Sequence, residues 1–150
     1  MPETNRVVVH TLSGNLLKGT TQDFFPKRPV FHVQLADGKP PVAVEIRQLK
    51  AVFFVKDFVG QAQRRDVRGF IHGPREMAQG KKLAVRFRDG ELLCGYSLSY
   101  SPEREGFFVF PADPGGNNLR IYVVTAACAE VKAGPAAEAM AQEAVDANVA

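Results

Sequence analysis

The sequence has no tryptophan, two cysteines and three histidines among its 150 residues. Two cysteines without clustered histidines do not supply the ligand set of a structural zinc site. Cys94 and Cys128 both lie within apolar strand-like patterns, so we expect two free, buried thiols and not a disulfide. The sequence therefore predicts no metal site and no disulfide framework.

Long apolar runs and a strong charge of one sign are also missing. No segment approaches the about 18 consecutive apolar residues of a membrane span, and the first ten residues do not resemble a secretory signal. Together with the free thiols, this predicts a cytoplasmic protein without a membrane partner. The net charge of +3 is mild, whereas nucleic-acid binders usually concentrate positive charge on one face.

The common catalytic motifs are absent as well. The sequence contains no G-x-S-x-G, no H-E-x-x-H and no phosphate-binding loop. The histidines His10, His32 and His72 are scattered, and none has a second histidine at ligand spacing. We therefore expect neither enzymatic activity nor a cofactor.

What the sequence does contain is one pattern that occurs twice. Residues 6–56 align without a gap on residues 82–132 at one constant separation, which is the 76 positions from Gly14 to Gly90. Gly19 and Gly95 match at the same separation. A unit of about 50 residues buries little core by itself, so we expect the two copies to pack into one body.

Each copy predicts five short strands. In the first copy they span residues 6–12, 16–23, 30–36, 42–47 and 49–56, and in the second 82–88, 92–100, 107–111, 119–124 and 127–132. Ser13-Gly14 and Asp89-Gly90 are typical of tight hairpin turns. Gly19 and Gly95 lie inside the second strand of each copy, where glycine indicates a bend. Five bent strands can bury a core by closing into a small barrel.

The alternation of side chains predicts the core and shows one difference between the copies. Phe31 and Val33 share a face with their counterparts Phe107 and Val109, whereas the opposite face changes from His32 and Gln34 to Phe108 and Phe110. We interpret this asymmetry as a contact between the copies. Phe108 and Phe110 are either a second layer of core or an exposed patch for a partner. Residues 51–55 are apolar on both faces, which indicates a strand covered on both sides.

Two resemblances extend this interpretation. Residues 7–19 and 83–95, with the turn glycine, the paired leucines and the second glycine, resemble the first motif of the Sm-like fold, a bent five-stranded barrel of the SH3 type. No residue matches the asparagine-containing RNA-binding motif of that fold, so RNA binding is not implied at any position. Residues 49–58, 87–92, 95–96 and 106–113, with Asn117-Asn118, resemble a family of uncharacterised bacterial domains, which implies an accessory or regulatory module.

We therefore expect an all-β protein, a tandem of two Sm-like five-stranded small barrels with pseudo-two-fold symmetry. The predicted boundaries are 1–57 for the first repeat, 58–81 for a connector and 82–133 for the second repeat. Residues 134–150 are rich in alanine and predict either a short C-terminal helix or a frayed tail. The resemblance implies open strand edges, and these favour a homodimer or ring if they are not covered within the chain.

The connector carries a cluster of arginines. Arg64 and Arg68 have the R-x-x-x-R spacing that resembles the first signature of PilZ domains, which bind cyclic di-GMP, while the second PilZ signature is absent. Guanidinium groups suit such a ligand because they form paired hydrogen bonds with phosphates and stack on bases. With Arg65 and Arg104 they form a candidate anion or nucleotide site. The alternative is a solvated basic linker.

For function, the sequence favours a non-catalytic binding or regulatory module that acts through protein–protein interaction, with Phe108 and Phe110 as candidate partner-binding residues. The alternative is an RNA or cyclic di-GMP binding protein that uses the connector arginines. The identity of the partner is left open.

Overall fold

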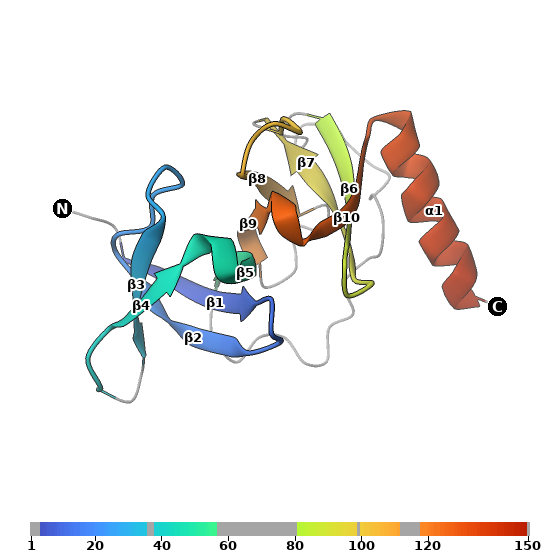
Figure 1. The fold of residues 1–150 in the computed structure, drawn as a ribbon. Coiled ribbons are helices and arrows are strands. Elements are labelled where there is room, and N and C mark those ends of the chain that lie inside the picture. Colours follow the sequence, from blue (N-terminus) through green and yellow to red (C-terminus); the bar gives the residue numbers. More distant parts are fainter. Residues whose placement is uncertain (1–3, 36–37, 57–80, 99, 112–117, 150) are drawn as a thin grey trace.

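The computed structural model describes residues 4–35, 38–56, 81–98, 100–111 and 118–149. Within them the protein is mostly β, with ten antiparallel strands in one sheet that is not closed and a C-terminal helix (Figure 1). The strands are β1 (Asn5–Thr11), β2 (Leu16–Thr21), β3 (Val30–Leu35), β4 (Val42–Glu45), β5 (Leu49–Val55), β6 (Lys81–Phe87), β7 (Leu92–Ser97), β8 (Gly106–Pro111), β9 (Asn118–Val124) and β10 (Cys128–Ala133). Short 3-10 turns, η1 (Ile46–Gln48) and η3 (Thr125–Ala127), precede β5 and β10.

The two halves of the sheet have the same strand order. The sheet runs β10-β6-β7-β8-β9-β5-β1-β2-β3-β4. Each half, β1–β5 or β6–β10, therefore has its fifth strand at one end, next to its first strand, and its fourth strand at the other end. We call residues 5–55 the first repeat and residues 81–133 the second repeat. The described strands form one continuous open sheet and not two closed barrels, and residues 58–80 of the predicted connector lie outside the described residues.

The strand pairing corrects the register of the repeat. Val7 of the first repeat pairs with Phe54, and Leu83, the counterpart of Val7 in the second repeat, pairs with Ala133. Phe54 therefore corresponds to Ala133, which lies 79 positions later and not 76. The same separation relates Val44 to Val123, which pair with the equivalent residues of β3 and β8. The second repeat therefore has three more residues than the first between its third and fourth strands. The identities seen beyond that point at a separation of 76, such as Ala51 with Ala127, are coincidental.

The repeats are joined by β5 and β9, and we call this pairing the joint. Ala51 lies opposite Val123, and Phe53 lies opposite Ile121. The joint brings the fifth strand of the first repeat against the fourth strand of the second, and these are not equivalent strands. A two-fold axis would pair equivalent strands, so the predicted pseudo-two-fold symmetry is wrong and the arrangement is head-to-tail.

Side chains of the joint alternate between two hydrophobic clusters. On β5, Val52 and Phe54 belong to the cluster of the first repeat, whereas Ala51 and Phe53 pack in that of the second. On β9, Tyr122 and Val124 join the first cluster, and Ile121 and Val123 join the second. This confirms the prediction of a strand covered on both faces. Each fully buried aliphatic or phenylalanine side chain contributes about 1.5–3 kcal/mol, so the joint is a major source of stability.

Helix α1 (Pro135–Val149) covers the second repeat and shows that the C-terminal segment is helical in its described part. Ala137 and Met140 pack with Ala84, and Leu92 and Cys94 pack against the same cluster. Figure 1 shows the helix on the outside of β6 and β10, far from the first repeat. No helix in the described part of the chain is both long and apolar enough to span a membrane.

Candidate functional site

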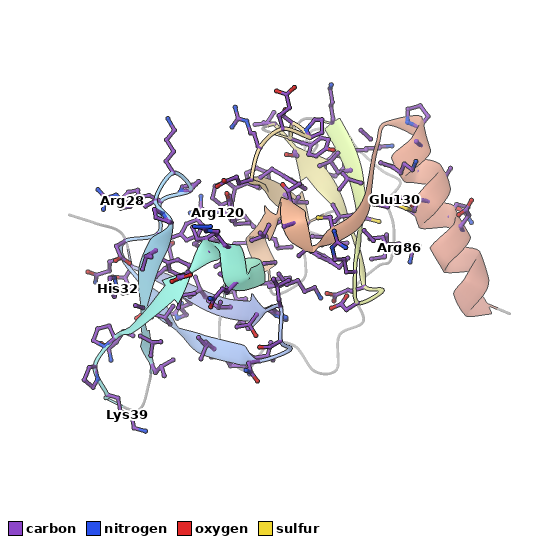
Figure 2. The ribbon with its side chains drawn as sticks, in the orientation of Figure 1. Arg28, His32, Lys39, Arg86, Arg120 and Glu130 are labelled. Atoms are coloured by element: carbon purple, nitrogen blue, oxygen red, sulfur yellow. The ribbon has the colours of Figure 1, made fainter. Side chains whose placement is uncertain are left out.

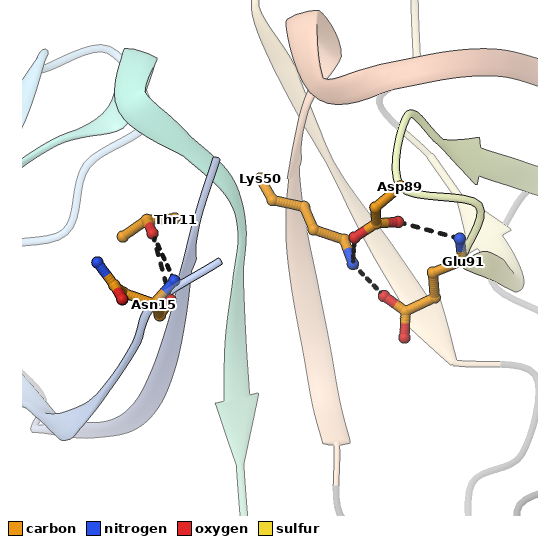
Figure 3. Close-up of polar contacts among 5 residues, drawn as sticks. All are labelled: Thr11, Asn15, Lys50, Asp89 and Glu91. Atoms are coloured by element: carbon orange, nitrogen blue, oxygen red, sulfur yellow. Dashed lines mark hydrogen bonds and ion pairs between the residues drawn. The ribbon is translucent and has the colours of Figure 1, made fainter. Parts of the chain in front are cut away.

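The joint contains one buried cation, Lys50, at the start of β5. Its Nζ donates a hydrogen bond to Asp89 Oδ2 at 2.7 Å and a second one to Glu91 Oε1, both on the β6–β7 hairpin (Figure 3). The ammonium also lies 4.6 Å from the centre of the Phe87 ring. Only 11% of the Lys50 side chain is exposed. Burial lowers the pKa of Lys50, but the hydrogen bonds to the two carboxylates outweigh it and leave that pKa raised. The charged lysine therefore connects the first repeat to the second.

His10 lies beside this ion pair. Its ring centre is 4.4 Å from that of Phe53, at a tilt of 48°. Burial lowers the pKa of His10, and the charge of Lys50 lowers it further, against the opposing effects of Glu91 and Asp89. At neutral pH the imidazole is therefore an uncharged ring packed at the joint.

The first repeat has a groove between its β1–β2 hairpin and β4, with a volume of about 580 Å³. Leu17 and Val42 are partly buried against the first hydrophobic cluster, and Val44 belongs to it. Leu12 is 54% exposed at the rim. The groove is lined by Thr11, Leu12, Ser13, Asn15, Leu17, Val42, Ala43, Val44, Glu45, Arg47, Gln48 and Leu49.

In the second repeat, the corresponding place is filled by β5. The apolar groove residues Leu17, Val42 and Val44 correspond to Leu93, Ile121 and Val123, by the pairings that relate the two repeats. Those three counterparts pack in the same cluster as Ala51 and Phe53 of β5. Among the described residues, the groove is therefore the open counterpart of the joint.

The two hairpins differ in charge. Ser13 and Asn15 of the first repeat stand where the second has Asp89 and Glu91. The backbone N–H of Asn15 donates to Thr11 Oγ1 at 2.9 Å (Figure 3). Thr11 Oγ1 also shares a hydrogen bond with Ser13 Oγ. The hairpin rim of the groove is therefore neutral, while the corresponding rim of the joint holds two carboxylates for Lys50.

The groove borders an open strand edge. Strand β4 pairs with β3 over Val42–Glu45 and forms one end of the sheet, so no strand among the described residues pairs with its other side. Pro40 and Pro41 come directly before β4, and a proline lacks the N–H that a strand pairing uses. An unpaired edge beside an apolar groove can accept an extended segment.

The predicted partner-binding residues lie on β8. Phe108 is half-buried against the first hydrophobic cluster, with its ring centre 5.1 Å from Tyr122, 6.1 Å from Phe54 and 6.2 Å from Phe24. The difference between the repeats at this position therefore reflects a contact between them, because His32, its counterpart on β3, is exposed. Phe110 is half-buried. A role in partner binding stays a prediction for both.

The predicted anion site falls mostly outside the described residues, because Arg64, Arg65 and Arg68 lie in segment 57–80. Arg104 is exposed in the turn before β8, where its carbonyl accepts a hydrogen bond from Thr125 Oγ1 at 2.7 Å. Arg120, which the sequence did not single out, lies over the rings of Phe54 and Phe108, 4.5 and 5.0 Å from their centres; Figure 2 labels its side chain.

Other titratable groups have structural partners. His32 Nδ1 lies 2.7 Å from Asp23 Oδ2, and the His32 backbone N–H donates to Asp23 Oδ1 at 2.8 Å. Desolvation raises the pKa of Asp23, but the hydrogen bonds from His32 and Thr21 outweigh it and lower that pKa. Within the described segments, no group of three or more His, Cys, Asp or Glu residues is arranged to hold a metal ion.

Sequence reasoning did not identify Lys50 or the groove. Lys50 is a charged residue at the start of an apolar run, and this was a usable signal because a lysine is rarely buried unless it is paired. The groove could not be found from the sequence, because its recognition depends on the three-residue change of register and on which edges the joint covers.

These features define a mostly β protein built from a duplicated five-stranded unit. The chain belongs to DUF6982, a family of unknown function, whose model matches residues 3–133. The comparisons with curated proteins and with solved structures gave no match.

Proposed function

We propose that the protein is a non-catalytic binding or regulatory module that acts through protein–protein interaction, and that the groove of the first repeat is its binding surface. The observation that carries the proposal is the open counterpart of the joint: an apolar floor, a neutral hairpin rim and an unpaired edge at β4. The same surface in the second repeat already binds a strand of protein. Leu12 adds exposed apolar area at the rim of the groove.

The finer fold assignment belongs to the same proposal. Each repeat is taken as an Sm-like five-stranded module, and this is supported by the shared strand order and by Gly19 and Gly95, where the second strand of each repeat closely approaches the third. The joint supports the assignment further. The resemblance to the Sm-like fold implies open strand edges, and the joint is a pairing of two such edges, the fifth strand of one repeat and the fourth strand of the other. The cytoplasmic location is supported by Cys94 and Cys128, which form no disulfide.

Photo-crosslinking in the native host tests the function. A photoreactive residue at Leu12, on the groove rim, is expected to yield an adduct with a discrete protein. The same residue at Glu130, an exposed site on β10, serves as the matched control and should not yield this adduct. The adduct should disappear when Leu17→Glu places a charge on the groove floor. Equal adducts at both positions, or none at either, would contradict the proposal.

The rival function is tested with labelled RNA and cyclic di-GMP at two salt concentrations. For single strands the affinity falls with salt at a log–log slope of about −0.7 per contacted phosphate. We expect no saturable binding to the wild-type protein at low salt. Saturable, salt-sensitive binding that is lost on replacing Arg64, Arg65 and Arg68 with alanine would show that the connector arginines define the function instead.

A further inference from the structure

We propose that the groove binds an extended segment of another protein as an added strand, antiparallel to β4 and in the register that β5 adopts against β9. This inference rests on the proposed function and specifies the ligand. The joint supplies the template, because it is a complete strand-in-groove complex built from the counterparts of the groove residues. The ligand is an uncharged segment with apolar residues at alternate positions.

The template defines the pattern of the ligand. In the joint, Ala51 lies opposite Val123, and Phe53 lies opposite Ile121. The groove presents Val44 and Val42 at these two positions. A small apolar residue opposite Val44, followed two positions later by a large apolar or aromatic residue, therefore reproduces the packing of the joint. The side chain between them points to the other face, because successive strand residues alternate.

The electrostatics select against a lysine at the position of Lys50. In the joint this ammonium is held by the carboxylates of Asp89 and Glu91, whereas the groove offers Ser13 and Asn15. Glu45 and Arg47 also line the groove, but their charges are of opposite sign. A lysine buried there would therefore lose water without gaining the net negative charge that the carboxylate pair gives the joint. The ligand therefore has an uncharged residue before its small apolar residue.

A second copy of this chain does not match the groove. The strand equivalent to β5 is β10, which has Glu130 and Lys132 where β5 has Ala51 and Phe53. The side chains of Glu130 and Lys132 are each 47% exposed, and Lys132 Nζ lies 4.0 Å from Glu130 Oε2. Docking β10 on β4 in the register of the joint would bury these two charges against apolar residues, at a cost that the neutral rim does not offset. This mismatch favours a different protein, and not a second copy, as the occupant.

Synthetic peptides test the inference on the full-length chain. The probe is the sequence of residues 49–55 with Lys50→Ser, LSAVFFV, followed by a glycine linker and lysines for solubility and read by fluorescence anisotropy. It should bind saturably to the wild-type protein. Leu17→Glu should weaken binding about tenfold or more, the loss of about 1.4 kcal/mol of apolar contact. The matched control Leu16→Glu, at an exposed neighbour on β2, should leave binding unchanged.

A gain of affinity keeps the test independent of any effect of Leu17→Glu on folding. Ser13→Asp with Asn15→Glu rebuilds the carboxylate pair at exposed positions of the hairpin. This double variant should bind the lysine-containing peptide LKAVFFV about two- to fivefold more tightly than the wild type does, the range of a partly exposed ion pair. Its affinity for LSAVFFV should not change.

Three results would overturn the inference. They are no saturable binding of LSAVFFV at about 1 mM, equal binding to the Leu17→Glu and Leu16→Glu variants, and equally tight binding of a peptide with the β10 sequence CAEVKA. The last would identify a second copy as the occupant. A crosslinked partner at Leu12 together with no peptide binding would leave the proposed function standing and reject strand addition alone.

Discussion

His10 shows how a single residue can make the joint sensitive to pH. Its ring packs on Phe53 beside the Lys50 ammonium, so a second positive charge there is unfavourable. Because burial lowers the pKa of His10 from the 6.5 of an unperturbed imidazole, the unfolded chain binds the proton first as the pH falls. Folding stability is therefore complete above pH 6.5 and decreases below it, until the folded-state pKa is passed.

The prediction is that the free energy of unfolding falls between pH 7.5 and pH 5 in the wild type, and that His10→Phe reduces this fall. The slope should be well below the about 1.4 kcal/mol per pH unit of one full proton, because the half-buried ring is partly screened by water. Urea titrations at several pH values measure the free energy of unfolding and therefore its slope with pH. An unchanged slope in His10→Phe, with Lys18→Gln as the surface control, would show that other groups cause the pH dependence.

Gly19 lies where β2 closely approaches its neighbour β3. A Cβ at this position would collide with the backbone carbonyl of Gln34 and lie 2.7 Å from Val33 Cγ1, and Gly95 has the same relation to Phe110 and Val109. A backbone carbonyl cannot move aside as a flexible side chain can. The two glycines are therefore required for close approach of β2 to β3 and of β7 to β8.

We predict that Gly19→Ala lowers the free energy of unfolding by about 1–3 kcal/mol, the usual cost of forcing an extra group into a packed site. Chemical denaturation measures this change. Lys18→Ala, at the exposed adjacent residue of the same strand, is the matched control and should change stability by less than about 0.5 kcal/mol. Equal effects of the two substitutions would show that β2 and β3 can separate at little cost.

At the scale of the element, α1 covers a face of the second repeat, whereas no α-helix within the described residues covers the corresponding face of the first repeat. Leu92 packs under α1, whereas its counterpart Leu16 is 53% exposed. The helix is connected to β6 by an ion pair between Lys82 and Glu138. Cys94 lies under the helix, and Cys128 lies near the joint, where burial raises its pKa to about 11. The two thiols therefore report on different parts of the molecule.

We predict that Met140→Asp displaces α1 and increases the rate at which Cys94 reacts with a thiol reagent, since a charge in this small apolar cluster is costly. Cys128 should stay slow in both proteins, because the thiolate is the reactive form and its raised pKa leaves little thiolate at pH 7.5. Mass spectrometry of the labelled peptides separates the two sites. Glu143→Asp, at an exposed helix position, is the control. Unchanged Cys94 labelling in Met140→Asp would show that the helix does not protect it.

At the scale of the whole molecule, the head-to-tail joint raises the question of what stops it from repeating. A heterologous contact can add further copies unless its free ends differ from the joined ones. Here both ends differ. Glu130 and Lys132 put charges on β10, and Pro40-Pro41 remove two backbone N–H groups beside β4. Charges are a common means of preventing edge-to-edge association, and the two prolines shorten the free edge of β4 to the residues from Val42 onward without closing it to an uncharged strand.

We predict that the wild type is a monomer by size-exclusion chromatography with light scattering. A quadruple variant restores joint-like residues at both ends: Glu130→Ala and Lys132→Phe on β10, with Pro40→Leu and Pro41→Arg before β4. It should form dimers or larger species in a concentration-dependent way. Glu130→Ala with Lys132→Phe alone should associate less. The open edges alone would favour a homodimer, so a wild-type homodimer would show that the charges and prolines do not prevent a second copy from pairing. A monomeric quadruple variant would show that the joint depends on more than these four positions.

Much of the local structure follows from neighbouring residues and was predictable. The Ser13-Gly14 and Asp89-Gly90 turns, the alternating strands around them and the two-faced run at residues 51–55 all depend on periodicity and turn chemistry within a few positions. The duplication was visible for the same reason, since both copies repeat these local patterns. Even the C-terminal helix was one of two alternatives that its composition allowed.

Relations between distant segments required the folded chain. The change of register between the repeats occurs in a loop, where insertions leave no periodic pattern, and it was hidden by chance identities such as Ala51 with Ala127. The head-to-tail joint, the pairing of Lys50 with Asp89 and Glu91, and the open groove beside β4 depend on which edges meet in space. Short-range patterns therefore set the strands and turns, whereas long-range packing between unlike edges decided which surface was covered and which stayed open.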